Sequence, residues 1–344
     1  AQGLFPHRCA HHIRAMRRRL PLLTVAELTG GGGELPCRLA SIWETGAFAV
    51  APCPGPLTPS PPFDAIRRLF DRADAALAAG HRPAPRPAAF TLEAKRPPPG
   101  PQPPRTTTAR FWRGLVCREG RERLGLAGTD RKRSIDLTME ALHSRSLSRR
   151  LGGDLALVQS FFAAQEEQEG ERGLVDLLAR SIHSTFGLSP AVLTGQRLHR
   201  LLDYREEVAD LPGPRCQPHA DYGSFTLLWE DAPGLEVLRP CGAWAERPTG
   251  AAVVVVAGSA LSLLTGGRVL APVHRVLAPE ASQKGQMTPR RSSLAYFVEP
   301  AKSQVLHPPR RPGEGGREPE SMTYGELKLR ARRCPSSTAA DREE

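Results

Sequence analysis

This 344-residue sequence has little lysine, no closely spaced cysteine pairs and no long apolar run. Only 5 of its 47 basic residues are lysine, and the other 42 are arginines spread along the whole chain, which gives a formal net charge of +11. Nucleic-acid-binding proteins usually concentrate basic charge on one face or one arm. A scattered arginine excess indicates codon bias instead, so we expect no nucleic-acid partner.

The cysteines and the apolar runs limit the class of protein further. The seven cysteines are an odd number, lie far apart and form no C-x-x-C pair. This argues against a disulfide framework or a zinc site and indicates reduced thiols in an intracellular protein. No stretch approaches the roughly 18 apolar residues that span a bilayer, so we expect no membrane partner. The expected location is the cytoplasm; a plastid or another organelle is the alternative, because the Arg-rich residues 1–19 contain no acid and resemble a transit-peptide remnant.

Hydrophobic periodicity and proline content divide the chain into four regions. These are the N-terminal segment 1–19, a helical and strand region 20–195, a core 196–300, and a tail 301–344 with a short closing helix. Apolar spacing predicts helices at 35–45, 60–79 and 148–186, the last as one or two helices capped by Gly187, and strands at 198–204 and 251–257. The prolines of residues 82–105 exclude a helix and favour an inserted loop over a ligand for SH3-type domains.

The chemistry of the core centres on the segment His219-Ala220-Asp221. Residues two apart on an extended backbone point to the same side, so this imidazole and this carboxylate can reach one metal ion. A second imidazole, His274, stands between valines that indicate a strand. Two imidazoles and one carboxylate suit Fe(II) and leave positions open for oxygen and a cosubstrate. By itself H-x-D is a weak signal, because it arises by chance in roughly one chain in three of this composition.

The segments that follow this motif strengthen the interpretation. Four segments succeed one another along the core. They are Tyr222-Gly223-Ser224-Phe225-Thr226-Leu227-Leu228-Trp229, the buried run 251–257, the strand around His274, and Arg291-Ser292-Ser293-Leu294-Ala295-Tyr296-Phe297-Val298-Glu299-Pro300. Their order and spacing resemble the Fe(II)- and 2-oxoglutarate-dependent dioxygenases of the isopenicillin N synthase-like superfamily, plant-type soluble branch. The resemblance implies a mainly β fold with flanking helices, a double-stranded β-helix (jelly-roll) barrel with a helical N-terminal extension.

The resemblance also implies roles for individual residues. His219, Asp221 and His274 are the expected iron ligands. Arg291 with Ser293 is expected to bind the far carboxylate of 2-oxoglutarate, because a guanidinium binds a carboxylate through two parallel hydrogen bonds.

The register of the arginine motif needs a decision, because Arg290 and Ser292 form an overlapping R-x-S pair. Strand alternation places Arg291, Ser293 and Phe297 on one face of the strand and Arg290 on the other. In the family, the face that corresponds to Arg291 points into the barrel. Tyr204 is the expected third partner of the carboxylate, although the family often has asparagine two positions before it and this chain has Leu202.

The expected function follows from the same resemblance. It is oxidation of a small organic metabolite by a monomer, most commonly hydroxylation, with O2 consumed, succinate and CO2 released, and ascorbate as reductant. Phe225, Leu227 and Phe297 are candidates for the substrate pocket, though core packing explains them equally well. Two alternatives stay open: an iron-dependent oxidase of the same superfamily that does not use 2-oxoglutarate, and a catalytically inactive binding homologue.

Overall fold

The computed structural model describes twelve parts of the chain. They are residues 19–29, 35–52, 60–78, 108–112, 115–119, 130–137, 145, 151–166, 173–208, 213–278, 286–310 and 320–333. The basic segment 1–18 and the proline-rich segment 82–105, for which the sequence predicts a transit remnant and an inserted loop, lie outside the described residues. In the described part of the chain, no helix combines the length and the apolar character needed to cross a membrane.

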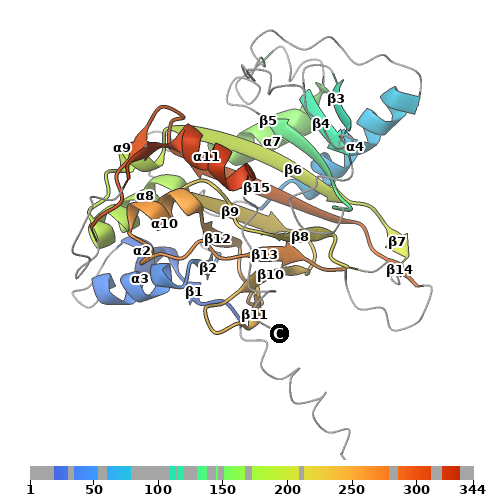
Figure 1. Ribbon diagram of the computed structural model, residues 1–344. Helices are drawn as coiled ribbons and strands as arrows, with labels where there is room; N and C mark the ends of the chain where they lie inside the picture. The colour runs from blue at the N-terminus through green and yellow to red at the C-terminus, as the bar shows by residue number, and fades with distance from the viewer. Residues whose placement is uncertain are drawn as a thin grey trace, which may run out of the picture.

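A nine-stranded sheet forms the frame of the molecule (Figure 1). Its strands are, in spatial order, β1 (Leu22–Leu23), β2 (Ala47–Val50), β12 (Val253–Ala257), β9 (Phe225–Glu230), β15 (Arg291–Glu299), β6 (Gln196–Tyr204), β5 (Arg133–Leu137), β4 (Leu115–Glu119) and β3 (Thr108–Trp112). All neighbours pair antiparallel except β1 and β2. The long pair β6 and β15 is in register from Arg291 opposite Tyr204 to Glu299 opposite Gln196. This pair holds Arg291 and Tyr204 side by side.

A smaller four-stranded sheet packs against one face of the large one. Its order is β11 (Trp244–Glu246), β10 (Leu235–Leu238), β13 (His274–Val276) and β8 (Cys216–His219). One buried cluster joins the two sheets, with Leu202 and Ala295 from the large sheet and Val237 and Val276 from the small one. The predicted mainly β fold with flanking helices is confirmed. The two larger sheets of the described strands face each other, however, and do not close into a barrel.

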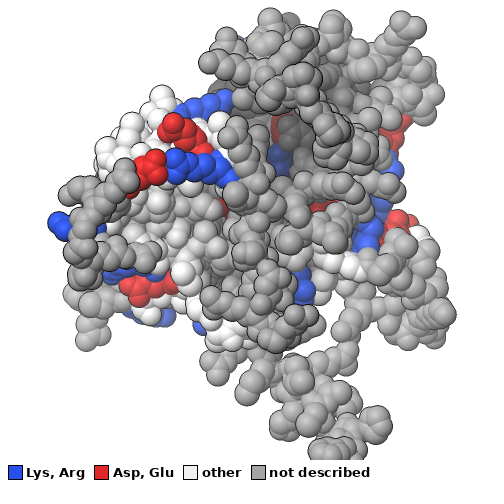
Figure 2. Space-filling view, viewed as in Figure 1, with Lys and Arg blue, Asp and Glu red and all other residues white. Residues whose placement is uncertain are grey.

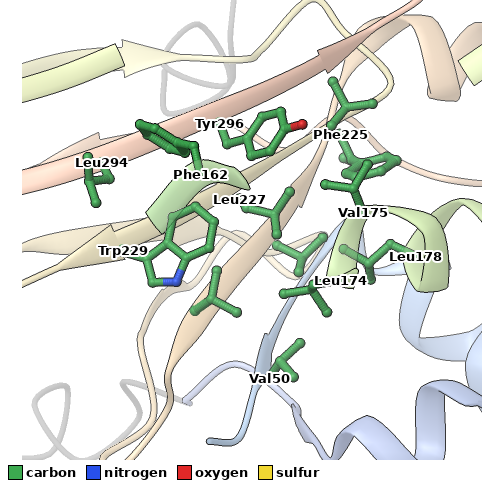
Figure 3. Close-up of a cluster of buried hydrophobic side chains, with 14 of the residues drawn as sticks. Val50, Phe162, Leu174, Val175, Leu178, Phe225, Leu227, Trp229, Leu294 and Tyr296 are labelled. Atoms are coloured by element: carbon green, nitrogen blue, oxygen red, sulfur yellow. The ribbon is translucent and has the colours of Figure 1, made fainter. Parts of the chain in front are cut away.

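Helices cover the other face of the large sheet. They are α2 (Val25–Thr29), α3 (Leu35–Glu44), α4 (Phe63–Ala78), α7 (Gly153–Ala163), α8 (Leu174–Phe186), α9 (Pro190–Leu193), α10 (Ser259–Leu264) and α11 (Tyr324–Arg333). Their apolar sides meet the sheet in the main core, where Phe162 of α7 packs edge-on against Tyr296 at 5.9 Å between ring centroids (Figure 3). Each large apolar side chain buried there stabilises the fold by about 1.5–3 kcal/mol.

The period of two along β9 and β15 separates this core from the space between the sheets. On β9, Phe225, Leu227 and Trp229 belong to the core under the helices, whereas Leu228 packs against the cluster between the sheets. On β15, Tyr296 faces the helices and Phe297 the smaller sheet. One strand thus supplies the core with one set of residues and the space between the sheets with the other.

Most predicted elements agree with the structure. The helix predicted at 148–186 is two helices, α7 and α8, and Gly187 ends α8 with the predicted cap, at a φ of 72° that glycine adopts without strain. In the C-terminal tail, β17 (Met322–Thr323) pairs with β16 (Val305–Leu306), and the predicted closing helix, α11, begins at Tyr324. The sequence did not indicate β3, β4 and β5, nor the pair β7 (Glu207–Val208) and β14 (Met287–Thr288).

Charged side chains of both signs are mixed on the visible surface. On the face shown in Figure 2, basic side chains of the described residues lie beside acidic ones. Two basic residues of α11 form ion pairs with acids outside the helix: Lys328 with Glu299 of β15, at 2.8 Å between Nζ and Oε1, and Arg330 with Glu320. The positive charge on this face is therefore interspersed with negative charge.

Candidate metal and cosubstrate site

His219, Asp221 and His274 meet between the two sheets. β8 and β13 pair antiparallel with His274 directly opposite His219, which places the two rings 4.3 Å apart between centroids. The Nε2 atoms of His219 and His274 lie 3.9 Å and 4.0 Å from Asp221 carboxylate oxygens. The three ligand atoms all lie within 4.8 Å of one another. One ion with bonds of roughly 2 Å can join them after small side-chain rotations.

Backbone and hydroxyl groups orient these three side chains. The Nδ1 atom of His219 lies 2.8 Å from the carbonyl oxygen of Gln217, and Nδ1 of His274 lies 3.4 Å from that of Pro272. A proton on each Nδ1 leaves Nε2 free to bind a metal. The hydroxyl of Thr226 donates to Oδ2 of Asp221 at 2.5 Å. The donor set, two neutral imidazoles and one carboxylate with room for further ligands, fits Fe(II).

The buried surroundings hold the three groups in their metal-binding protonation states. Burial lowers the pKa of His219, and burial together with the neighbouring His219 lowers the pKa of His274 to about 4. Burial alone raises the pKa of Asp221, but the two imidazoles and the Thr226 hydroxyl outweigh it and hold this pKa below its usual value. At neutral pH both imidazoles are therefore neutral and Asp221 is a carboxylate.

The three ligands line a pocket that opens to solvent. Arg291, Ser293 and Tyr204 line the same pocket from the large sheet. The two arginines of the motif lie on opposite sides, as strand alternation predicts. Arg291 faces the pocket and is 3% exposed, whereas Arg290, the residue before β15, turns to the opposite side, where it binds Asp203 at 2.6 Å and Asp71 at 2.9 Å.

The guanidinium of Arg291 is held from several sides. Its Nη1 donates to Oγ of Ser293 at 3.3 Å, and its Nε donates to the carbonyl oxygen of Ala232 at 3.0 Å. The ring of Tyr204 lies 5.0 Å from the guanidinium carbon. Burial, with a smaller effect from Cys216, raises the pKa of Tyr204 to about 12, so its hydroxyl stays protonated and can donate to an anion.

Glu230 is a pocket residue that the sequence did not indicate. Its carboxylate forms an ion pair with Nη2 of Arg291 and a second one with Nε of Arg247 at 2.9 Å. The described contacts engage three of the five N–H groups of Arg291, so two are left to bind a carboxylate. The arginine thus fits the far end of a dicarboxylate, but it already carries one anion.

Two further cations line the pocket and were also missed. Lys132, just before β5, and Arg200, on β6, each bind an acidic residue, Asp130 at 3.0 Å and Asp136 at 2.6 Å. The arginine also lies over the ring of Phe297, at 5.5 Å. One signal for Lys132 was in the sequence, since lysine is rare in this arginine-rich chain.

The three predicted substrate-pocket residues separate into two groups. Phe297 lines the pocket, as predicted. The prediction for Phe225 and Leu227 is wrong, because both lie in the core under the helices on the opposite face of β9. Leu228 and Glu230 line the pocket in their place.

Comparison with known proteins agrees with this arrangement. Residues 197–300 match the model of the 2OG-Fe(II) oxygenase superfamily. The chain is 28% identical to the 2-oxoglutarate-Fe(II) type oxidoreductase ppzD of Metarhizium rileyi, over 41% of this chain and 43% of that protein. It is 29% identical to 1-aminocyclopropane-1-carboxylate oxidase 1 of Oryza sativa, over 46% of this chain and 49% of that protein.

Solved structures share the fold over most of the chain. A full-length Neurospora crassa protein, solved in complex with alpha-KG, superposes with a TM-score of 0.60 at 20% identity, over 93% of this chain and 98% of that one. In sequence, by contrast, the chain spans less than half the length of the two curated relatives. Residues 197–300, which carry the His-Asp-His group, therefore match the 2OG-Fe(II) oxygenase superfamily, and the chain shares the fold of the solved structure over most of its length.

Proposed function

We propose that the protein catalyses the Fe(II)- and 2-oxoglutarate-dependent oxidation of a small organic metabolite, most simply its hydroxylation, with release of succinate and CO2. The observation that carries this proposal is the position of Arg291, Ser293 and Tyr204 in the same pocket as His219, Asp221 and His274. Bound iron would supply the activation of O2 that is coupled to oxidative decarboxylation of the 2-oxo acid.

The protein's own groups prepare this chemistry. The triad presents two neutral donors and one anionic donor without first losing protons, because the imidazole pKa values are lowered. Arg291 and the Tyr204 hydroxyl would bind the far carboxylate of the cosubstrate, and Ser293 keeps the guanidinium in place. Apolar walls that include Leu228 and Val276 would keep water away from the reacting centre.

A second candidate is an iron-dependent oxidase that does not use 2-oxoglutarate. Glu230 favours it, because this carboxylate already neutralises the arginine that a dicarboxylate would need. The similarity to 1-aminocyclopropane-1-carboxylate oxidase is a further reason to keep it, and a catalytically inactive binding homologue is the remaining alternative. Succinate release coupled to substrate oxidation separates the first candidate from the second. A purified protein that binds no iron would support the inactive homologue.

The remaining features of the proposal concern partners and conditions. We propose a monomer in the cytoplasm that acts on a small molecule, without a nucleic-acid or membrane partner, and that uses ascorbate to keep iron reduced. The mixed charge on the surface in Figure 2 is consistent with the absence of a nucleic-acid partner.

One experiment tests the reaction and finds the substrate together. A metabolite extract is incubated with the protein, Fe(II), ascorbate and 2-oxoglutarate and then compared by mass spectrometry with a sample that contains His219→Ala protein. The proposal expects a metabolite that gains one oxygen with the wild type and is unchanged with the variant. Equal conversion by both proteins would contradict it.

A further inference from the structure

Lys132 is a charged residue of the pocket wall that the proposed reaction does not yet use. It lines the same pocket as the three metal ligands and Arg291, and its side chain is 12% exposed. It comes just before β5, outside the 197–300 segment that defines the family match. The packing of the region before residue 197 against the core therefore determines where Lys132 lies.

The contacts of Lys132 leave part of its binding capacity unused. The ammonium nitrogen lies 3.0 Å from Oδ2 of Asp130 and 2.8 Å from Sγ of Cys216. An ammonium has three N–H donors, and a thiol is only a weak acceptor. The other oxygen of Asp130 accepts the backbone N–H of Gln217 at 2.7 Å, so this carboxylate is shared. At least one N–H of Lys132 remains for a strong acceptor.

The other two cations of the pocket have more oxygen acceptors around them than Lys132 has. Arg200 binds both carboxylate oxygens of Asp136, at 2.6 Å and 3.2 Å. Arg291 donates to Glu230, Ser293 and Ala232. Among the described residues, Lys132 has one oxygen acceptor, that of Asp130, whereas Arg200 has at least two and Arg291 has three. A buried cation with few acceptors gains most from an anionic ligand.

We infer that Lys132 is a second carboxylate-binding residue of the pocket, in addition to Arg291. This inference rests on the proposed function, which brings an acidic cosubstrate into the same space. The carboxylate can come from 2-oxoglutarate itself or from the primary substrate. Leu202, Leu228, Val276 and Phe297 line the pocket beside these cations, so a substrate of this kind would be a small acid with an apolar body.

The test measures binding, not turnover, and compares four proteins loaded with Mn(II). They are the wild type, Lys132→Gln, Lys132→Arg and Lys328→Gln. The last is a matched control, because it breaks another partly buried lysine–carboxylate pair, between Lys328 of α11 and Glu299 of β15. The first arm titrates 2-oxoglutarate by calorimetry. The second arm measures how strongly Mn(II) relaxes the proton signals of benzoate and of uncharged benzamide, with 2-oxoglutarate present.

The two arms distinguish the sources of the carboxylate. Loss of a charge-assisted hydrogen bond should weaken binding by roughly ten- to hundredfold. If Lys132→Gln weakens the binding of 2-oxoglutarate by this factor while Lys132→Arg and Lys328→Gln do not, the carboxylate that Lys132 binds belongs to the cosubstrate. If the binding of 2-oxoglutarate is unaffected but the preference for benzoate over benzamide disappears, the carboxylate belongs to the substrate.

The remaining outcomes overturn one claim or the other. Unchanged binding in both arms overturns the role of Lys132. Failure of the wild type to bind 2-oxoglutarate overturns the proposed function, while the benzoate arm still tests the lysine. Should Lys132→Gln unfold because Asp130 is left without its cation, the double variant Asp130→Asn, Lys132→Met removes both charges, and it is expected to give the same two results.

Discussion

Glu230 and Arg291 form an ion pair inside the pocket, and the side chains are 2% and 3% exposed. Burial lowers the pKa of Arg291, but Glu230 and Tyr204 outweigh it and the net pKa is raised, so the guanidinium stays charged. A buried ion pair costs desolvation free energy that its mutual attraction and further hydrogen bonds offset. The same pair means that a dicarboxylate approaching Arg291 meets an anion that is already there. The affinity for 2-oxoglutarate therefore depends on Glu230.

Replacing Glu230 with glutamine should tighten 2-oxoglutarate binding about fivefold. The amide keeps the shape and one acceptor oxygen but removes the competing charge, and a difference of about 1 kcal/mol corresponds to this factor. Calorimetric titration of the Mn(II)-loaded variant measures it.

Arg247 provides the control with the opposite sign. Arg247→Gln removes the other cation bound to Glu230, at 2.9 Å, so the Glu230 carboxylate should bind Arg291 more strongly. The affinity for 2-oxoglutarate should therefore fall. Changes of the same sign in both variants would contradict the proposed competition.

The hydroxyl of Thr226 should set the metal affinity through Asp221. Thr226→Val keeps the side-chain volume at this fully buried position but removes the 2.5 Å hydrogen bond to Oδ2 of Asp221. Loss of a group that orients a metal ligand typically costs 10- to 100-fold in affinity. Mn(II) binding followed by electron paramagnetic resonance is the measurement. Thr288→Val, which removes another buried hydroxyl that donates to the carbonyl oxygen of Glu207, should leave Mn(II) affinity unchanged.

Close backbone packing beside Asp221 predicts an intolerant glycine. A Cβ atom on Gly258 would lie 2.2 Å from the carbonyl oxygen of Gly223, and the next residue, Ser259, donates its backbone N–H to the carbonyl oxygen of Asp221 at 2.8 Å. Gly258→Ala should therefore lower both the unfolding midpoint and the Mn(II) affinity. Gly153→Ala, where a Cβ meets nothing within 4 Å, should change neither measurably. Equal effects of the two substitutions would show that this packing is unimportant.

The lowered pKa of His274 predicts the pH dependence of metal-free stability. In the unfolded chain a histidine takes up a proton near pH 6.5, whereas folded His274 does so only near pH 4. Below pH 6.5 the unfolded state therefore binds more protons, and the free energy of unfolding falls as the pH falls. From pH 6.5 to pH 5 this residue alone accounts for about 2 kcal/mol.

Urea denaturation in the presence of EDTA at the two pH values measures this loss. His274→Asn should have a shallower dependence on pH than the wild type, because it removes the group that titrates differently. His307→Gln, at an exposed position, should keep the wild-type dependence. A steep loss of stability that survives in His274→Asn would contradict the prediction.

The resemblance gave the proposed roles of the metal ligands and of the arginine, and local rules gave part of their placement. The period of two brings His219 and Asp221 to one side and separates Arg290 from Arg291. The face of β9 was not predictable in this way. The sequence Phe225-Thr226-Leu227-Leu228-Trp229-Glu230 has apolar residues on both faces, so alternation alone does not tell which face meets the helices.

Other parts of the pocket depend on contacts between distant segments. Lys132 meets Cys216 across 84 positions of the chain, and no local pattern encodes that meeting. The strand β5 contains charged residues such as Arg133 and Asp136, and it is a strand because it pairs with β6. Composition gives such a segment no strand signal, so tertiary pairing decides its structure.

The most direct test of the account is succinate formation without any added substrate. The wild-type protein, the His274→Ala variant and the Thr288→Val control are each given Fe(II), ascorbate, O2 and labelled 2-oxoglutarate, and bound iron is measured in parallel. The account predicts slow succinate formation by the wild type and the control, and loss of both iron and succinate in His274→Ala. A His274→Ala protein that still binds one equivalent of iron and forms succinate at the wild-type rate would contradict it.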